Sequence, residues 1–131
     1  MVAAMRNVVL IADPDPFRLE VLLDGFEAMG FQCLTATTGS DALATAGSYV
    51  PQLAILHAEL PEVEGTDVCL RLKQEPRTQK IAVLLIGKDA HEERFVGSEV
   101  GADAYLPEPY TEEDLFVRVR QMFDELRLND R

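Results

Sequence analysis

The sequence predicts an α/β protein in which a parallel sheet lies between two layers of helices. Five short apolar runs rich in β-branched residues recur along the chain of 131 residues, and a stretch with helical periodicity follows each run. The runs are apolar throughout rather than alternating, as is typical of strands buried on both faces. Strands separated by helices pair in parallel through right-handed crossovers. We therefore predict a three-layer α/β sandwich of five strands and five helices.

The predicted strands span residues 8–12, 31–35, 53–56, 81–86 and 104–106. In the helix after the first strand, Asp15 can cap the start, Pro16 suits the first turn and Gly30 marks the end. The apolar residues of this helix recur at steps of three and four, which places them on one face: Leu19, Leu22, Leu23, Phe26 and Met29.

A fourth helix is expected between residues 87 and 104, with His91 as a surface residue early in it. The last helix opens at Thr111, whose spacing from Asp114 resembles a capping box. Four residues then form its apolar stripe: Leu115, Val119, Met122 and Leu126. A stripe at this spacing is more often core than a binding surface, and we interpret it as core.

Length and composition indicate one globular domain. Apolar residues make up 47% and charged residues 27% of the chain. We predict a single domain over residues 1–131, with a core at about 7–124 and a helix end or tail at 125–131. No apolar run approaches the roughly 18 residues that span a bilayer, and the N-terminal stretch makes a poor signal peptide. Cys33 and Cys69 fit no metal or redox spacing, which indicates reduced, buried thiols in a cytoplasmic protein without a membrane partner.

Acidic residues dominate the charge of the chain. Against 12 lysines and arginines stand 23 aspartates and glutamates, and the net charge is −11. A free-standing nucleic-acid binder is usually basic, so we expect no direct contact with DNA or RNA. Solvated helix faces explain most of the acidic residues, but not those that follow strands.

Polar and small residues follow four of the predicted strands. They are Asp13-Pro14-Asp15, His57-Ala58-Glu59, Gly87-Lys88 and Pro107-Glu108-Pro109. The carboxyl ends of parallel strands meet at one edge of a sheet, and functional groups of α/β proteins gather there. We therefore expect the functional site at this edge.

Four blocks of sequence resemble the receiver domain of two-component response regulators, over about residues 7–123. VLIADPDP resembles the first strand and acidic turn of that family, and PQLAILHAELP its phosphoacceptor strand. EGTDVCLRLKQEPRTQKIAVLLI resembles its third helix and fourth strand, and GADAYLPEPY its fifth strand and proline turn. The resemblance implies a flavodoxin-like fold with strand order 2-1-3-4-5 and a role in bacterial signal transduction.

The chemistry of the family is phosphoryl transfer to an aspartate, supported by two acids that hold a divalent metal, a Thr or Ser, and a Lys. By resemblance, Asp13 matches the first acid, the second acid falls on Pro14, and the acceptor falls on His57. The hydroxyl position falls on Gly87 and the lysine position on Glu108. We therefore expect a degenerate phosphorylation site at these five residues, with weak or absent Mg²⁺ binding, no cofactor and no enzymatic activity.

His57 is open to three interpretations. It is either a silent replacement that hydrogen-bonds a neighbouring carboxylate, or the centre of a proton switch in which Asp13 and Glu108 favour the imidazolium form. The third interpretation is a site for zinc or a similar ion, with Asp13, Glu59 or Glu108 as further ligands beside the imidazole. Asp15 could replace the lost metal ligand, although capping the first helix is its simpler role.

The resemblance also assigns residues around the fifth strand. Tyr105 resembles the aromatic switch residue of the family, and Gly87 leaves room for its ring to point inward permanently. The alternative is an edge aromatic packed under the fourth helix. Glu108-Pro109 resembles a turn that is a cis peptide in the family, and we expect the cis bond to be retained.

If the site is inactive, function must come from the surface. The fourth helix, the fifth strand and the fifth helix form the face on which receivers commonly dimerise or meet partners, so this face is the expected interaction surface. Aromatic and arginine residues often anchor interfaces, which makes six residues candidates: Arg94, Phe95, Tyr105, Tyr110, Arg118 and Arg120. A partner protein, or a second copy in a homodimer, is expected there.

The sequence supports three functions, in descending order. The first is a pseudo-receiver that acts as a phosphorylation-independent protein interaction module. The second is a receiver-fold sensor whose pocket at Asp13, His57 and Glu108 binds a proton, a metal or a small ligand. The third is a functioning phosphotransfer receiver with unusual residues, which the missing Thr and Lys equivalents weaken most.

Overall fold

The computed structural model describes residues 7–129 and contains one parallel sheet. The strands run in the order β2-β1-β3-β4-β5, which confirms the predicted topology. β1 has the predicted bounds, and the bounds of the other strands differ from the prediction by one residue. The ends of the predicted domain, residues 1–6 and 130–131, lie outside the described residues. The strands are β1 (Val8–Ala12), β2 (Gln32–Ala36), β3 (Leu53–His57), β4 (Ala82–Gly87) and β5 (Ala104–Pro107).

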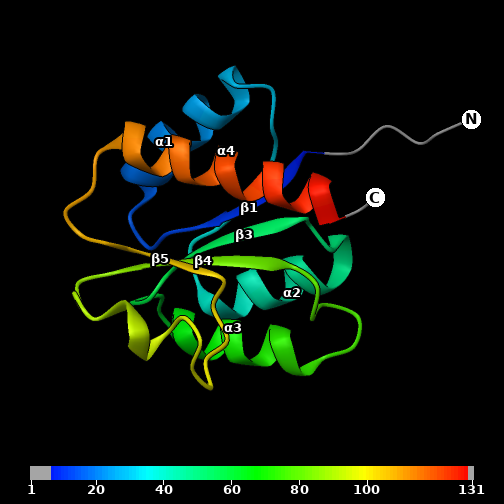
Figure 1. The fold of residues 1–131 in the computed structure, drawn as a ribbon. Coiled ribbons are helices and arrows are strands. Elements are labelled where there is room, and N and C mark those ends of the chain that lie inside the picture. The colour runs from blue at the N-terminus through cyan, green and yellow to red at the C-terminus, as the bar shows by residue number, and fades with distance from the viewer. Residues whose placement is uncertain (1–6, 130–131) are drawn as a thin grey trace, which may run out of the picture.

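Helices cover both faces of the sheet (Figure 1). One layer holds α1 (Pro16–Ala28) and α4 (Glu112–Asn129), and the other holds α2 (Gly39–Tyr49) and α3 (Gly65–Gln74). Successive strand residues point to opposite faces, so each buried strand contributes to two hydrophobic clusters, one under each layer. The molecule is therefore the predicted three-layer sandwich. Within residues 7–129, no helix is both long and apolar enough to cross a bilayer.

The fourth predicted α-helix does not form. The segment between β4 and β5 contains a single 3₁₀ turn, η1 (Glu92–Arg94), and a short bridge between Val96 and Ala102. Gly97 has a φ of +73° and Gly101 a φ of +77°, and an α-helix contains neither value. The chain turns back at these glycines, so the expected helical face beside β5 is replaced by an irregular loop.

The start of α1 is built as the sequence predicts. The Asp15 carboxylate accepts the backbone N–H groups of Phe17 at 3.0 Å and Arg18 at 3.4 Å, and Pro16 occupies the first turn. Gly30 follows the helix with a φ of +92°. This cap fixes the direction in which the chain leaves β1.

The start of α4 also forms the predicted capping box. The Asp114 N–H donates to Thr111 Oγ1 at 3.0 Å, and the Thr111 N–H donates to the Asp114 carboxylate at 3.5 Å. Of the predicted stripe, Leu126 is half-buried and the other three residues are buried: Leu115, Val119 and Met122. The stripe is core, as expected.

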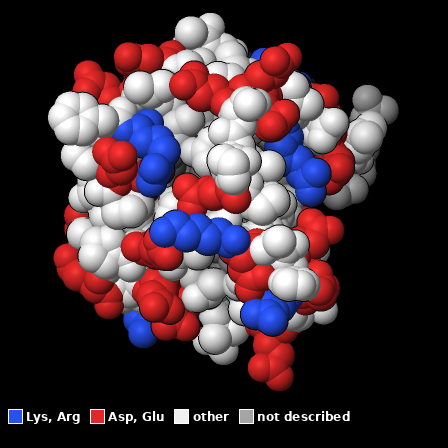
Figure 2. Space-filling model, turned by 90° about the vertical axis from the view of Figure 1, so that its left-hand side faces the viewer, with Lys and Arg blue, Asp and Glu red and all other residues white. Residues whose placement is uncertain are grey.

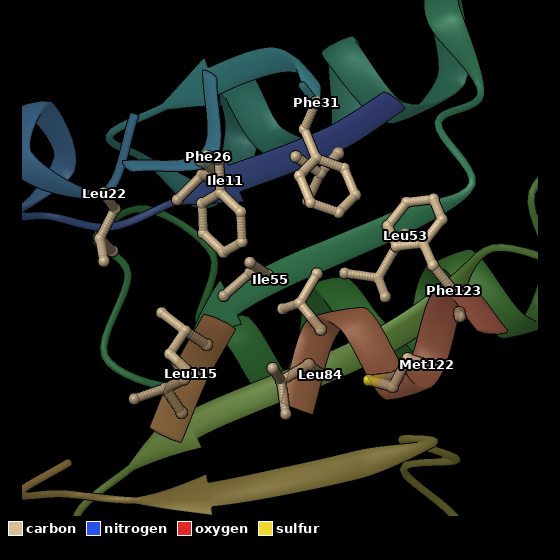
Figure 3. Packing of buried hydrophobic residues seen from close by; sticks show 14 of the residues in the cluster. Ile11, Leu22, Phe26, Phe31, Leu53, Ile55, Leu84, Leu115, Met122 and Phe123 are labelled. Atoms are coloured by element: carbon tan, nitrogen blue, oxygen red, sulfur yellow. The ribbon is translucent and has the colours of Figure 1, made fainter. Parts of the chain in front are cut away.

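The cluster between the sheet and the layer of α1 and α4 has an aromatic centre (Figure 3). The ring of Phe26 packs edge-to-face on Phe31, with centroids 5.7 Å apart, and on Phe116, with centroids 4.9 Å apart. Gly25 allows α4 this close, because a Cβ on Gly25 would overlap the Phe116 ring. Burying a side chain of this size contributes about 2–3 kcal/mol.

The two cysteines are free but differ in burial. Cys69 is buried as expected, whereas Cys33 on the edge strand β2 is only half-buried, which corrects the prediction for that residue. Burial is the main cause that raises the pKa of Cys69 to about 12 and the pKa of Cys33 to about 11. Both thiols are therefore protonated and unreactive near neutral pH.

Candidate functional site

The polar residues that follow the strands meet at one edge of the sheet. His57 closes β3 beside Ile86 of β4, and Gly87 closes β4 beside β5. Backbone bonds extend this edge: the Ala58 N–H donates to the Ile86 carbonyl at 2.7 Å, and the Glu108 N–H donates to the Gly87 carbonyl at 2.7 Å. Figure 2 views the molecule from this end and shows basic side chains with acidic ones around them.

His57 is buried, and both of its ring nitrogens have partners. Nδ1 accepts the Glu59 backbone N–H at 3.1 Å, and Nε2 lies 3.1 Å from Oε1 of Glu108. A nitrogen that accepts carries no proton, so the proton of the neutral ring sits on Nε2 and is donated to Glu108. The ring is held as one tautomer. A second proton, on Nδ1, would break the bond from Glu59.

The start of α3 covers the backbone of His57. The Gly65 N–H donates to the Ala58 carbonyl at 3.0 Å. A Cβ on Gly65 would overlap the carbonyl oxygen of His57. Glycine at this position therefore lets α3 close over the end of β3, which keeps water away from the histidine.

Asp13 pairs with Arg18 rather than with His57, which corrects the predicted three-residue proton switch. Asp13 is 2% exposed, and its Oδ2 accepts from Arg18 Nε at 2.6 Å while Oδ1 accepts from Nη2 at 2.8 Å. The Asp15 N–H donates to the same Oδ1 at 2.8 Å. The hydrogen bonding of Arg18 to the Asp13 carboxylate is the main cause that raises the pKa of Arg18. Arg18 thus places a permanent positive charge at the acidic turn.

The residues present do not fit a divalent metal. Both oxygens of Asp13 are engaged, Pro14 has no ligand atom in its side chain, and Asp15 caps α1. Glu59 faces Lys88, with Oε2 and Nζ 3.7 Å apart. Among the described residues no three His, Cys, Asp or Glu side chains converge as a metal site. The metal site considered around Asp13 and Glu59 is therefore not assembled.

Tyr105 lies next to the space that a side chain at position 87 would fill. Its ring is buried and stacks on Phe95, with 4.7 Å between centroids and 18° between planes. A Cβ on Gly87 would lie 3.0 Å from the Tyr105 hydroxyl and 3.1 Å from the Ala58 Cβ. Burial is the main cause that raises the pKa of the Tyr105 hydroxyl. Tyr105 is therefore not one of the exposed interface residues that the sequence predicts.

The predicted interface arginines lie on different surfaces. Arg94 is exposed in η1, and its Nη1 lies 3.0 Å from Oδ2 of Asp89. Arg118 is exposed on the side of α4 that faces β5. The guanidinium of Arg120 lies 5.8 Å from the ring centre of Phe31, which directs it toward the start of β2 and away from β5. Arg120 is thus not part of the expected face.

A cleft of about 270 Å³ lies beside the site, between α1 and the turn after β5. Arg18, Glu108, Pro109 and Tyr110 line it. Tyr110 is half-buried, and burial is the main cause that raises the pKa of its hydroxyl to about 12. The peptide bond between Glu108 and Pro109, which forms this turn, is cis, as the resemblance implies.

Arg18 is the site residue that the sequence interpretation missed. It is the third residue of α1, and side chains in the first turn of a helix tilt toward the helix N-terminus. A basic residue there can reach back to a carboxylate that precedes the cap, as Arg18 reaches Asp13. The sequence feature that could have predicted this ion pair is the helix cap at Asp15 followed by an arginine three residues later.

Comparisons with known proteins agree with this fold. The family model of the response regulator receiver domain matches residues 9–120. The chain is 34% identical over 124 residues to the DNA-binding dual master transcriptional regulator RpaA of Synechocystis, which covers 94% of this chain and 50% of that protein. It is 30% identical over 116 residues to the alkaline phosphatase synthesis transcriptional regulatory protein PhoP of Bacillus subtilis, which covers 88% of this chain and 48% of that protein. The chain thus spans about half the length of these relatives.

Solved structures are similar over nearly the whole chain. The signal receiver domain of a signal transduction histidine kinase from Syntrophus aciditrophicus has a TM-score of 0.81 and 27% identity, and covers 91% of each chain. A CheY-like receiver domain protein from Methanospirillum hungatei has a TM-score of 0.85 at 24% identity, and covers 95% of this chain and 99% of its own. The second likeness bears on the fold alone.

Proposed function

The chain belongs to the response regulator receiver domain family, and we propose that it is a receiver that no longer accepts a phosphoryl group and acts as a protein interaction module. Receiver domains of two-component signalling interact with partner proteins, and this general role applies to the chain as a member of the family. The proposal adds that partner binding is independent of phosphorylation, that the chain is not an enzyme, and that it acts in the cytoplasm.

One contact carries the proposal: Nε2 of His57 lies 3.1 Å from Oε1 of Glu108. In the family these two positions hold the aspartate that accepts the phosphoryl group and the lysine that binds its oxygens. Here the two side chains bind each other, so the space between them is filled. The remaining lone pair of the imidazole, on Nδ1, accepts the Glu59 N–H and is not free to attack.

Charge at position 108 also opposes a bound phosphate. Two like unit charges ~4 Å apart repel by about 4 kcal/mol at an effective dielectric of about 20, and a glutamate imposes this repulsion where a lysine would attract. The Glu108 side chain is 20% exposed, so solvent screens part of it. Even half of this energy lowers an affinity roughly thirtyfold.

Arg18 supports the same proposal at the end of β1. Its guanidinium takes both oxygens of Asp13 through bonds of 2.6 and 2.8 Å. The positive charge that the family takes from a metal is supplied here by the chain itself. A guanidinium differs from a metal ion because it offers no open coordination position to a phosphoryl oxygen.

The edge formed by β5 and α4 is the surface that we propose for the partner. A shallow groove of about 330 Å³ runs between them, lined in part by Leu106, Val117 and Arg118. Val117 is exposed, and Arg118 makes no ion pair with a residue in the range 7–129. An exposed apolar residue beside an unpaired arginine suits a protein interface, either with a different protein or with a second copy of the chain.

The intact mass of the protein after incubation with acetyl phosphate and Mg²⁺ tests the proposal. We expect the mass of the unmodified chain, because the acceptor position holds an imidazole whose two nitrogens are already bound. A phosphoryl adduct on the unaltered chain, on His57 or on any carboxylate of the edge, would refute it. An active receiver domain in the same reaction shows that the reagent is competent.

A variant that restores four family residues is the matched control. It carries Pro14→Asp, His57→Asp, Gly87→Thr and Glu108→Lys. An adduct on this variant alone would identify these four positions as the cause of the loss. Saturable amide shifts of the unaltered chain with Zn²⁺, or with pH at His57, would instead favour the receiver-fold sensor.

A further inference from the structure

α2 and α3 pack side by side on the face of the sheet opposite α1 and α4 (Figure 1), and a groove of about 290 Å³ lies between them. We call it the α2–α3 groove. Its aliphatic wall is formed by Leu43 of α2 and Leu72 of α3, and Gly47 of α2 lies along it. Two exposed arginines line its rim, Arg71 in α3 and Arg77 in the turn after α3.

No contact among residues 7–129 explains why position 47 is a glycine. It lies inside α2, where glycine is among the poorest helix formers. Its φ is not positive, and a Cβ at this position would meet no atom within 4 Å. Each of the other seven glycines has either a positive φ or a neighbour that its Cβ would touch. Open space above a helical glycine allows another molecule to approach the backbone closely.

The arginines of the groove lack acidic partners in a strongly acidic protein. Among residues 7–129, no carboxylate lies within 4 Å of Arg71 or Arg77. Arg77 Nε donates to the Gly47 carbonyl at 2.8 Å, which holds its guanidinium beside the groove. The negative ends of α2 and α3 attract both side chains, but the other guanidinium donors of Arg71 and Arg77 have no hydrogen-bond partner among the described residues. Glu75 is the only acid among the described residues that line the groove.

We propose that the α2–α3 groove binds an acidic segment of a partner protein. An apolar side chain of that segment would lie over Gly47, between Leu43 and Leu72, and its carboxylates would pair with Arg71 and Arg77. Unpaired arginines select acidic residues by charge, and the open glycine admits the apolar one. This surface lies apart from the β5–α4 edge, and the proposal does not depend on whether the strand-end site accepts a phosphoryl group.

Titration of the full chain with the acetylated peptide DELFDE, followed by amide NMR, tests the proposal. The peptide NQLFNQ is the matched neutral probe. We expect saturable shifts at the amides of Leu43, Gly47 and Arg71 with DELFDE. The affinity for NQLFNQ should be lower by a factor of about ten or more. Absence of saturable shifts at these amides, or equal affinity for the two peptides, would overturn the proposal.

Two variants separate the groove from the rest of the surface. Gly47→Leu fills the groove and improves helix propensity. Arg71→Glu reverses the charge at the rim of the groove and removes no hydrogen bond or ion pair with another described residue. Each should weaken DELFDE binding about tenfold, and Gly47→Ala, which adds only a methyl group, should weaken it less than Gly47→Leu does. Arg120→Glu, outside the groove, should bind as the parent does. Retained binding in both Gly47→Leu and Arg71→Glu would contradict the assignment. Shifts of the groove amides with protein concentration alone would identify a second copy as the occupant and would also overturn it.

Discussion

The interior of the sheet and its carboxyl-end edge differ in what holds their residues in place. The interior is a set of apolar side chains that pack by size and shape, as the aromatic centre around Phe26 shows. At the edge, each of two buried polar side chains is held by one charged side chain and one backbone N–H. Arg18 and the Asp15 N–H hold Asp13, and Glu108 and the Glu59 N–H hold His57. Packing by shape tolerates many sequences, whereas the edge depends on specific pairs of polar side chains.

The largest effect is expected in the interior. Phe26→Ala removes a fully buried ring and should lower the free energy of unfolding by about 3–5 kcal/mol. Chemical denaturation measures it. Phe17→Ala in the same helix is the control, because Phe17 is 80% exposed and its truncation should cost less than about 0.5 kcal/mol. Equal costs for the two variants would show that burial does not distinguish these regions.

At the edge, Arg18→Ala should have the next largest effect. It leaves the buried carboxylate of Asp13 without its cation, which should cost about 2–3 kcal/mol. This is below the usual loss for a fully buried pair, because the Arg18 side chain is 34% exposed. Replacing both partners, with Arg18→Ala and Asp13→Asn, should cost less than Arg18→Ala alone. A double variant less stable than the single one would contradict the pairing.

Gly87 connects the two regions, and a smaller effect is expected there. Gly87→Ala brings a methyl group to the Tyr105 hydroxyl and should cost about 1 kcal/mol. Tyr105→Phe removes that hydroxyl, so the double variant should regain part of the loss, while the 3.1 Å contact with the Ala58 Cβ remains. The four stabilities of this double-mutant cycle give the coupling. Additive losses would mean that Tyr105 does not occupy the space beside Gly87.

The effect that is smallest at neutral pH appears only at alkaline pH, and it distinguishes the two thiols. The folded state keeps Cys69 protonated up to about pH 12, while the unfolded chain loses this proton near its ordinary value of 9.0. Stability should therefore be fully present below about pH 9 and fall as pH rises toward 12. Cys69→Ala should reduce this fall more than Cys33→Ala, because the pKa of Cys33 is raised only to about 11. Denaturation midpoints across this pH range provide the comparison.

The same contrast explains what the sequence could predict. The layers and both capped helices follow from short-range apolar periodicity and cap residues such as Asp15 and Thr111. The strand order was predicted only from the resemblance to receiver domains. The predicted helix between β4 and β5 was wrong. The spacing of the apolar residues in this segment is typical of a helix, but Gly97 and Gly101 adopt positive φ values. Composition does not reveal that conformation.

The edge could be predicted only in part. The sequence places Asp13, His57, Gly87 and Glu108 at strand ends, and the structure brings His57 and Glu108 into contact. The sequence alone could not show which carboxylate pairs with which basic side chain at this edge, because the pairing depends on the directions of the side chains. Asp13 accepts hydrogen bonds from Arg18 and is therefore not part of the predicted switch with His57.

The amide spectrum with Mg²⁺ and beryllofluoride tests the central claim most directly. Beryllofluoride mimics a phosphoryl group, so its binding requires the metal, the acceptor and the lysine together. The paired edge predicts that the amides of Asp13, His57, Gly87 and Glu108 keep their positions through the titration, while the variant with four restored residues responds. Saturable shifts of these amides in the unaltered chain would contradict the claim that its strand-end site is closed.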